Sequence, residues 1–278
     1  GAASNWPMHD TIRGKGQQIV SNNNNAEVAG GTELASFDSA GFTVSGTAGS
    51  YNASSNSYVA FAWNAGGANT TNTSGTITSI VRANPTAGFT IVTYSGNGSA
   101  GATVGHGLGA APSMLIIKGR NNGTSGIVWH TGYNTNQGQM LLDSTAAIYN
   151  PGSGLYFNST TPGASVVTLG TSSAVNDATY TYVMYAFTPI AGFSAFGSYT
   201  GNGSSDGPFV FTGFRPKYVM AKVSSTTGPW NIFDSSRGTY NVNQPDLWAN
   251  SSNAETANNI DFLSNGFKVR DGGGDLNG

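Results

Sequence analysis

Apolar residues occur along this chain in short runs, and Gly, Asn, Ser or Pro bounds each run. β-branched and aromatic side chains dominate the runs, and no long segment places apolar residues at the spacing of a helix face, so we expect strands and not helices. Strands are predicted at 89–94, 113–117, 166–169, 180–187, 209–211 and 218–223. Turn signals between closely spaced strands indicate an all-β fold of antiparallel sandwiches.

Two local patterns refine this prediction. The run 180–187 carries bulky residues on both parities, so we expect both faces of that strand to be covered, as in a sandwich that also packs on a neighbour. The Asn-Gly pairs at 97–98 and 202–203 predict tight hairpin turns with positive φ.

The chain also repeats its own sequence. The pattern W-x3-D-x2-R-G occurs at 6–14 and 230–238, and each copy is followed by Ala-Glu and then by Gly-Phe-x-Val. An aromatic run ending in Gly-Asn-Gly occurs at 88–98 and 192–203, and each copy precedes a strand that begins after Pro and ends in Lys. The segment 58–63 matches the closing strand at 182–187.

These patterns define tandem repeats of about 100 residues. Residues 1–64 form the C-terminal half of a first unit (the first half-unit), 88–188 a complete unit (the middle unit), and 192–278 a third unit without its closing strand. Residues 65–87 are predicted to be a linker whose second part has the composition of a short strand. Either the sequence is a piece of a longer polypeptide or a neighbouring subunit supplies the missing strands, and we favour the first.

Composition narrows the function. Charged residues make up only 9% of the chain, the net charge is −2, and there is no Cys. Without a basic surplus nucleic-acid binding has no support, and without Cys there is neither a disulfide nor a thiolate metal site. The chain also lacks an apolar stretch long enough for a transmembrane helix, so no membrane insertion is expected. A polar surface with few charges is typical of extracellular assemblies.

The W-x3-D-x2-R-G pattern supplies the candidate ligand-binding residues, which are Trp6, Asp10, Arg13, Trp230, Asp234 and Arg237. In one interpretation the Trp ring stacks on a sugar and the Asp binds hydroxyl groups. In the other, the Asp pairs with the Arg to fix a turn while the Trp packs in the core. We favour the second, because Trp129 of the middle unit falls where Trp230 does and has neither Asp nor Arg in register.

Catalytic chemistry has little support in the sequence. A glycosidase needs two nearby carboxylates, yet the complete middle unit contains Asp143 and Asp177 and no Glu. The three His residues do not recur in register, and the glycine-rich turns lack the Lys-Ser/Thr of a phosphate loop. We therefore expect no catalytic residues, no metal site and no cofactor.

As a set, the motifs resemble tail-fibre-type virion proteins of marine and freshwater tailed bacteriophages. The resemblance rests on Y-[TS]-G-N-G, P-x2-hydrophobic-K, W-x3-D-x2-R-G, S-N-G-F-K at 264–268 and Y-V-x-[FY]-A-F, and it covers all but 65–87. It implies a repeated, lectin- or jelly-roll-like β-sandwich on a virion surface, without assigned catalytic residues. Members of that family continue past S-N-G-F-K to a closing strand, which this sequence lacks.

The resemblance predicts a non-enzymatic structural protein of a phage virion, tail-fibre-like or adhesive, which attaches the particle to its host. As partners it predicts other copies of the chain, other virion proteins and a host-surface glycan. Repetition would let weak contacts sum to firm attachment. Three alternatives stay open: a capsid decoration or head-fibre protein, a subunit of a bacterial extracellular filament or adhesin joined by strand exchange, and, less favoured, a carbohydrate-active enzyme.

Overall fold

The computed structural model describes residues 4–46, 49, 51–132, 138–150, 152 and 154–278. All the regular elements in these residues are β-strands, and every pairing between named strands is antiparallel. The predicted all-β antiparallel fold is therefore confirmed. The described residues contain no helix of the length and apolar character that a membrane crossing would need.

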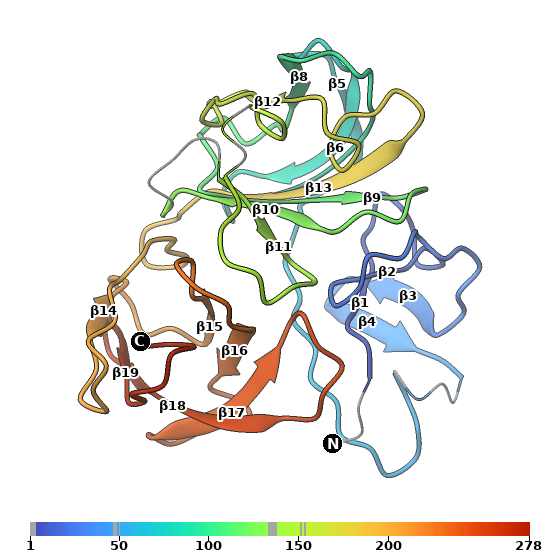
Figure 1. Cartoon of the computed structure of the whole chain (residues 1–278). Coiled ribbons are helices and arrows are strands. Elements are labelled where there is room, and N and C mark those ends of the chain that lie inside the picture. Colours follow the sequence, from blue (N-terminus) through green and yellow to red (C-terminus); the bar gives the residue numbers. More distant parts are fainter. Residues whose placement is uncertain (1–3, 47–48, 50, 133–137, 151, 153) are drawn as a thin grey trace.

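The strands gather in three lobes around a common centre (Figure 1). The first half-unit forms two hairpins, which comprise β1 (Pro7–Met8), β2 (Ile19–Val20), β3 (Leu34–Asp38) and β4 (Gly41–Val44). The third unit forms one six-stranded sheet in the order β14-β19-β18-β17-β16-β15. Its strands are β14 (Phe209–Phe211), β15 (Tyr218–Lys222), β16 (Trp230–Asp234), β17 (Asn243–Trp248), β18 (Thr256–Leu263) and β19 (Gly266–Val269).

The middle unit pairs a seven-stranded sheet, in the order β11-β10-β9-β13-β7-β6-β5, with a short sheet of β8 and β12. Two of the strands, β5 (Thr70–Asn72) and β6 (Ser79–Asn84), come from the preceding segment 65–87. The others are β7 (Phe89–Ser95), β8 (Ala102–Gly105), β9 (Met114–Gly119), β10 (Ile127–His130), β11 (Met140–Leu141), β12 (Val166–Leu169) and β13 (Thr181–Phe187). The six runs expected from the sequence thus form β7, β9, β12, β13, β14 and β15.

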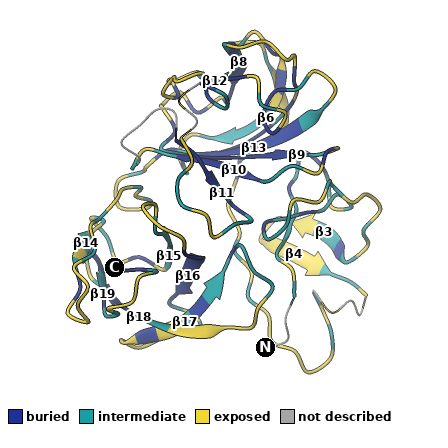
Figure 2. Cartoon of the chain, viewed as in Figure 1, coloured by how far each residue is buried: buried dark blue, intermediate teal, exposed yellow. Residues whose placement is uncertain are grey.

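Both faces of β13 are covered, as its residue pattern predicts (Figure 2). Tyr182 and Met184 point into a core inside the middle unit, between its two sheets. Val183 and Tyr185 point into a second core, which residues of all three lobes share. This shared core positions the lobes relative to one another, and the third unit adds a separate core of its own.

Residues 65–87 differ from the expected linker, because β5 and β6 lie within them and extend the sheet of the middle unit beyond β7. The part read as a short strand is β6. Thr70 begins β5 inside the stretch that composition alone marked as flexible. Pairing with β6, which itself joins β7, makes this segment a strand, and polar β-branched residues serve well on an exposed sheet edge.

The segment 58–63, matched by sequence to β13, forms no strand pair among the described residues. In the middle unit β13 lies between β7 and β9, and the first half-unit contains no counterpart of either strand. The segment instead lays Phe61 and Trp63 against Tyr218, with ring centroids 4.8 and 5.9 Å away.

The two Asn-Gly turns have the expected positive φ at Gly98 and Gly203, but they do not close hairpins. Each is held by a buried asparagine far along the chain. The side chain of Asn176 accepts from the backbone N–H of Asn97, and that of Asn277 accepts from Asn202 in the same way. The matched turns of the middle and third units are therefore held by the same type of hydrogen bond.

Candidate functional site

The Asp of the W-x3-D-x2-R-G pattern shapes a tight turn directly after a short strand. In the first half-unit the Asp10 carboxylate accepts from the backbone N–H groups of Ile12 and Arg13, at 3.0 and 2.8 Å. Short polar side chains that accept from N–H groups two and three residues ahead stabilise such turns. The turn brings the Arg13 side chain back over the same carboxylate, to which its Nε donates.

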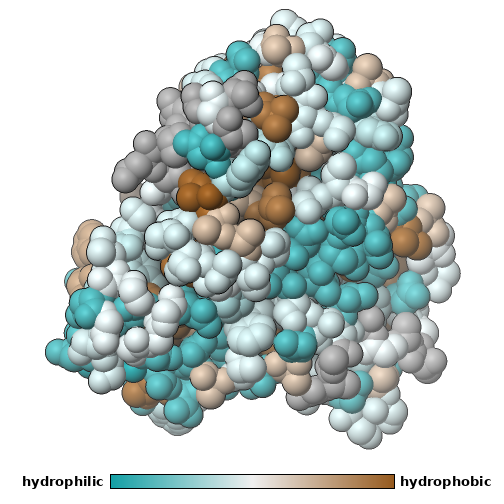
Figure 3. Space-filling model, viewed as in Figure 1, coloured by the Kyte–Doolittle hydropathy of each residue, from teal (hydrophilic) through white to brown (hydrophobic). Residues whose placement is uncertain are grey.

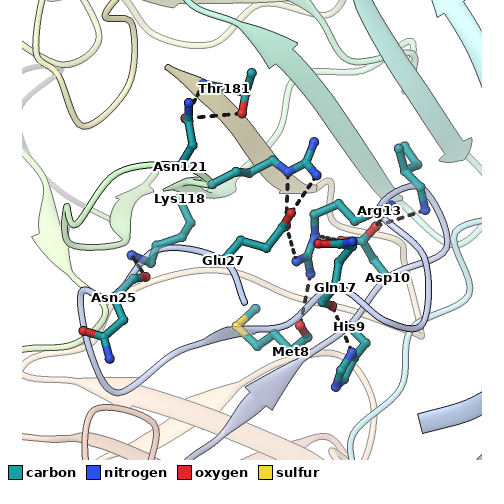
Figure 4. A network of polar contacts seen from close by, with 12 residues as sticks. Met8, His9, Asp10, Arg13, Gln17, Asn25, Glu27, Lys118, Asn121 and Thr181 are labelled. Atoms are coloured by element: carbon teal, nitrogen blue, oxygen red, sulfur yellow. Dashed lines mark hydrogen bonds and ion pairs between the residues drawn. The ribbon is translucent and has the colours of Figure 1, made fainter. Parts of the chain in front are cut away.

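Arg13 uses its remaining nitrogens to join two lobes. Nη1 donates to Glu27 at 2.8 Å, and Nη2 donates to the Met8 carbonyl and to the hydroxyl of Tyr185, both at 3.0 Å. The Tyr185 hydroxyl in turn donates to Asp10 at 2.8 Å. Tyr185 belongs to β13 of the middle unit, so this network fastens the first half-unit onto that strand. Figure 4 shows the contacts of Arg13 with Met8, Asp10 and Glu27.

A second arginine, Arg120, completes the network. Its Nη2 donates to Glu27 at 2.7 Å, while its carbonyl accepts from the Glu27 backbone N–H at 2.6 Å. We call Asp10, Arg13, Glu27, Arg120 and Tyr185 the buried clamp. The Arg13 side chain has no exposed surface, and that of Glu27 is 9% exposed.

Glu27 and Arg13 keep their charges despite burial. Burial by itself raises the pKa of Glu27, but the ion pairs with Arg120 and Arg13 outweigh it and leave that pKa below its ordinary value. Burial lowers the pKa of Arg13, yet Tyr185 and Asp10 more than reverse this effect. Burial raises the pKa of Tyr185, which therefore stays protonated and able to donate.

The third unit repeats the motif with the same internal bonds. Asp234 accepts from the backbone N–H groups of Ser236 and Arg237, both at 2.9 Å. Arg237 donates through Nε to Asp234 and through Nη1 to Glu255, the latter at 2.6 Å. We call these three residues the open cluster, because Glu255 is 41% exposed and no tyrosine or second arginine joins it among the described residues.

The two tryptophans of the pattern are occupied by packing. Trp230 is 4% exposed and donates through its indole N–H to the Leu141 carbonyl at 2.9 Å. Trp6 is half-buried and stacks on Phe61, with ring centroids 6.2 Å apart. With Asp10, Arg13 and Asp234 also buried, this geometry favours the structural interpretation over a sugar platform.

The predicted register of Trp129 with Trp230 is wrong. Trp129 pairs with Leu115, and Phe233 pairs with Val219, the matching position in the third unit. Trp129 therefore corresponds to Phe233 and packs in the core of the middle unit. His130, which pairs with Met114, takes the place of Asp234, which pairs with Tyr218. Tyr133, the residue that sequence spacing would align with Asp234, lies outside the described residues.

A second junction, which the sequence analysis missed, recurs between successive units. Lys118, at the end of the P-x2-hydrophobic-K pattern in the middle unit, donates to the carbonyls of Asn24 and Asn25 in the first half-unit, both at 3.0 Å. Lys222, its counterpart in the third unit, donates to the Thr145 carbonyl of the middle unit at 3.2 Å. Each lysine thus binds a loop of the preceding unit.

Backbone bonds support both of these lysine junctions. The Glu27 N–H donates to the Arg120 carbonyl, and the Ile148 N–H donates to the Ser224 carbonyl at 2.9 Å. Burial lowers the pKa of Lys118 and of Lys222 to about 8. The signal for this junction was the terminal Lys of an apolar strand, an unusual residue to bury unless carbonyl oxygens receive it.

A polar cluster on the third unit's sheet was also missed. Asp246 of β17 is fully buried and accepts from the Ile232 backbone N–H, the Trp248 indole and the Asn258 amide. Burial raises the pKa of Asp246 to about 6, because hydrogen bonds only partly offset the loss of water. Across the described residues, no three His, Asp or Glu side chains are arranged to hold a metal ion.

Comparison with known proteins gives one match. A family model described as a domain of unknown function (DUF7483) matches residues 1–278. No curated protein and no solved structure matches the chain.

Proposed function

The chain belongs to the DUF7483 family, and from the geometry of its junctions we propose that it is a non-enzymatic structural module of a phage virion surface, tail-fibre-like, which attaches the particle to its host. It works as several copies together with other virion proteins, and it presents its surface to host glycans. The tandem β-units give it length and number, so that individually weak contacts sum to firm attachment.

The observation that carries this proposal is the use made of the chain's few charged side chains. Arg13, Glu27 and Arg120 fasten one lobe onto the next, and Lys118 and Lys222 repeat one contact at two successive junctions. The ion pairs and hydrogen bonds of these side chains hold the lobes in fixed positions. A rigid particle-surface module needs fixed junctions of this kind, whereas an enzyme needs acids and bases free to meet substrate.

The outer surface supports the same function. Figure 3 shows a face on which hydrophilic and near-neutral residues predominate and hydrophobic residues form small patches. Only 9% of all residues are charged. Hydroxyl- and amide-rich surfaces of this kind form hydrogen bonds with sugars at little desolvation cost, because no ion has to lose its hydration shell.

Location on a particle tests the proposal directly. Antibodies raised against the purified chain are applied to phage lysates in which its gene is expressed, and the label is located by electron microscopy. Label along tail fibres is expected, while label on the capsid shell identifies a decoration protein. Virions without label overturn the proposal. Binding of the fluorescent chain to whole host cells, competed by envelope glycans, tests attachment separately.

One alternative, a subunit of a bacterial filament or adhesin, is favoured by a specific observation. The segment 58–63 has the sequence of a closing strand but forms no strand pair among the described residues, and β15 pairs only with β16 where its counterpart β9 has two neighbours. Donation of such a segment to another subunit would build a filament by β-strand addition. Label on cell-attached filaments in the same experiment would establish this alternative.

A further inference from the structure

Two hairpins with the same three residue pairs next to the turn differ in what covers them. In the third unit β18 and β19 pair Phe262 with Phe267, and in the first half-unit β3 and β4 pair Phe37 with Phe42. Phe262 and Phe267 are 1% and 7% exposed. Phe37 and Phe42 are 39% and 45% exposed, and Figure 2 shows β4 coloured as exposed.

The covered hairpin shows what its uncovered twin lacks. β14 pairs antiparallel with the outer edge of β19 and places Val210 opposite Phe267. Val210 packs against the core that also buries Phe267. β4 pairs with β3 alone, so its outer edge has no strand partner among the described residues. An edge strand with unpaired N–H and C=O groups is a template for another strand.

The sequence of β4 is suited to pair with β4 of a second copy of the chain. An antiparallel partner that copies β14 must set a valine opposite Phe42, and β4 carries Val44 two residues after Phe42. When two β4 strands meet about a two-fold axis at Thr43, Phe42 of each copy faces Val44 of the other, which reproduces the pair Phe267–Val210. Thr43 then faces Thr43, a favourable cross-strand pair.

We propose that two copies of this chain associate through the free edges of β4, which pair antiparallel about a two-fold axis at Thr43 and set Val44 of each copy against the exposed Phe42 of the other. A two-fold axis makes the contact self-complementary and therefore closed. The contact deepens the proposed function and rests on it for its use, since it names the surface through which copies on a particle join.

Charge does not oppose this pairing. The strand Gly41–Val44 contains no charged residue and no proline, the two devices that commonly block an edge. The nearest acid, Asp38, lies on β3 and accepts from the Thr43 hydroxyl at 2.7 Å. Across the axis the two Asp38 carboxylates are three strand spacings apart, roughly 14 Å, which exceeds the Debye length of about 8 Å at physiological salt.

The absence of Cys from the chain allows a direct test by cross-linking. In an antiparallel pair the facing Cα atoms are about 4.5–5.5 Å apart, within the range a disulfide spans. We expect Thr43→Cys to give a disulfide-linked dimer on mild oxidation. Lys268→Cys is the matched control, because Lys268 takes the place of Thr43 in the twin hairpin and faces Phe209. A monomeric Thr43→Cys variant, or equal cross-linking of both variants, overturns the proposal.

A second variant separates association from folding. Thr43→Lys brings two like charges together on the axis, while Lys268 shows that this hairpin position accommodates lysine. Sedimentation equilibrium should show at least a tenfold weaker dimer, with a melting temperature unchanged at concentrations where both chains are monomeric, and association equal to that of the unmodified chain overturns the proposal. If the chain is monomeric but antibodies against it label virions, only this contact is refuted. If the chain dimerises through β4 but virions carry no label, only the proposed function is refuted.

Discussion

The buried clamp and the open cluster share an aspartate, an arginine and a glutamate in the same internal arrangement. In each, an aspartate closes the turn, and an arginine bridges that aspartate to a glutamate. They differ in their surroundings, because Tyr185 and Arg120 lie over the first while the glutamate of the second is 41% exposed. The motif thus determines its own bonds, and the neighbouring unit determines whether those bonds also hold two lobes together.

The sharpest test of this difference removes the arginine from each copy. Arg13→Ala leaves Asp10 as a buried charge without its arginine and leaves Glu27 paired with Arg120 alone, so we expect a loss of about 3–5 kcal/mol in the free energy of unfolding. Arg237→Ala should cost less, about 1–3 kcal/mol, because buried Asp234 also loses its arginine but water reaches Arg237 and Glu255. Urea unfolding of both variants measures the contrast, and equal losses would show that burial by the middle unit adds nothing.

A smaller change tests the contact between lobes alone. Tyr185→Phe keeps the ring in the shared core but removes the hydroxyl that bridges Arg13 and Asp10. One buried hydrogen-bonding group lost beside charged partners should cost about 1–3 kcal/mol. Tyr199→Phe, which removes a hydroxyl bonded to the Leu276 carbonyl within one unit, is the control. Limited proteolysis should release the first half-unit faster in Tyr185→Phe only.

The lysine junctions allow the same comparison, with smaller expected losses in the free energy of unfolding. Lys118 donates to Asn24, Asn25 and Thr124, whereas Lys222 donates to Thr145 and Val223. Replacing each by Met keeps the apolar stem and removes the donor, so Lys118→Met should lose about 1–2 kcal/mol and Lys222→Met about half of that. Thermal unfolding checks the order, and a larger loss for Lys222→Met would contradict it.

The strands were predictable because short apolar runs between turn residues carry local information. Residues 166–169 and 209–211 form strands with the predicted bounds. The positive φ of Gly98 and Gly203 was equally local. What failed was pairing, since the Asn-Gly turns connect different sheets and Thr70–Asn72 joined a sheet instead of a linker. Pairing depends on partners that sequence spacing does not reveal.

The candidate site was predictable in its residues and in its Asp–Arg pair, but not in its contacts with the middle unit. The spacing from Asp10 to Arg13 identified the ion pair, and the matching Glu27 was visible in the repeat. Tyr185 and Arg120 were invisible as partners, because they lie more than 90 residues away in sequence. The Trp129 register failed for a related reason, since strand pairing aligned Phe233 with it and not Trp230.

The weakest expected effect concerns pH, and it acts in opposite directions on the two regions. The Glu27 pKa is lowered by its ion pairs, so the clamp's contribution is complete above the unfolded value of about 4.3 and is lost as pH falls below it. The Asp246 pKa is raised by burial to about 6, so its contribution is complete below the unfolded value of about 3.9 and is lost as pH rises through 6.

Acidification from pH 7 to 5 should therefore slow hydrogen exchange in β17, after correction for the intrinsic rate. It should not slow exchange in residues 6–20, where burial lowers the pKa of His9 and protonation of that residue acts against folding. A further step to pH 3.5 should speed exchange in residues 6–20. Glu27→Gln should abolish the second response, while Glu255→Gln, the change at the exposed counterpart, should leave it intact. If both regions respond together across one pH window, the clamp does not act as a separate charged junction and the third unit does not titrate through Asp246.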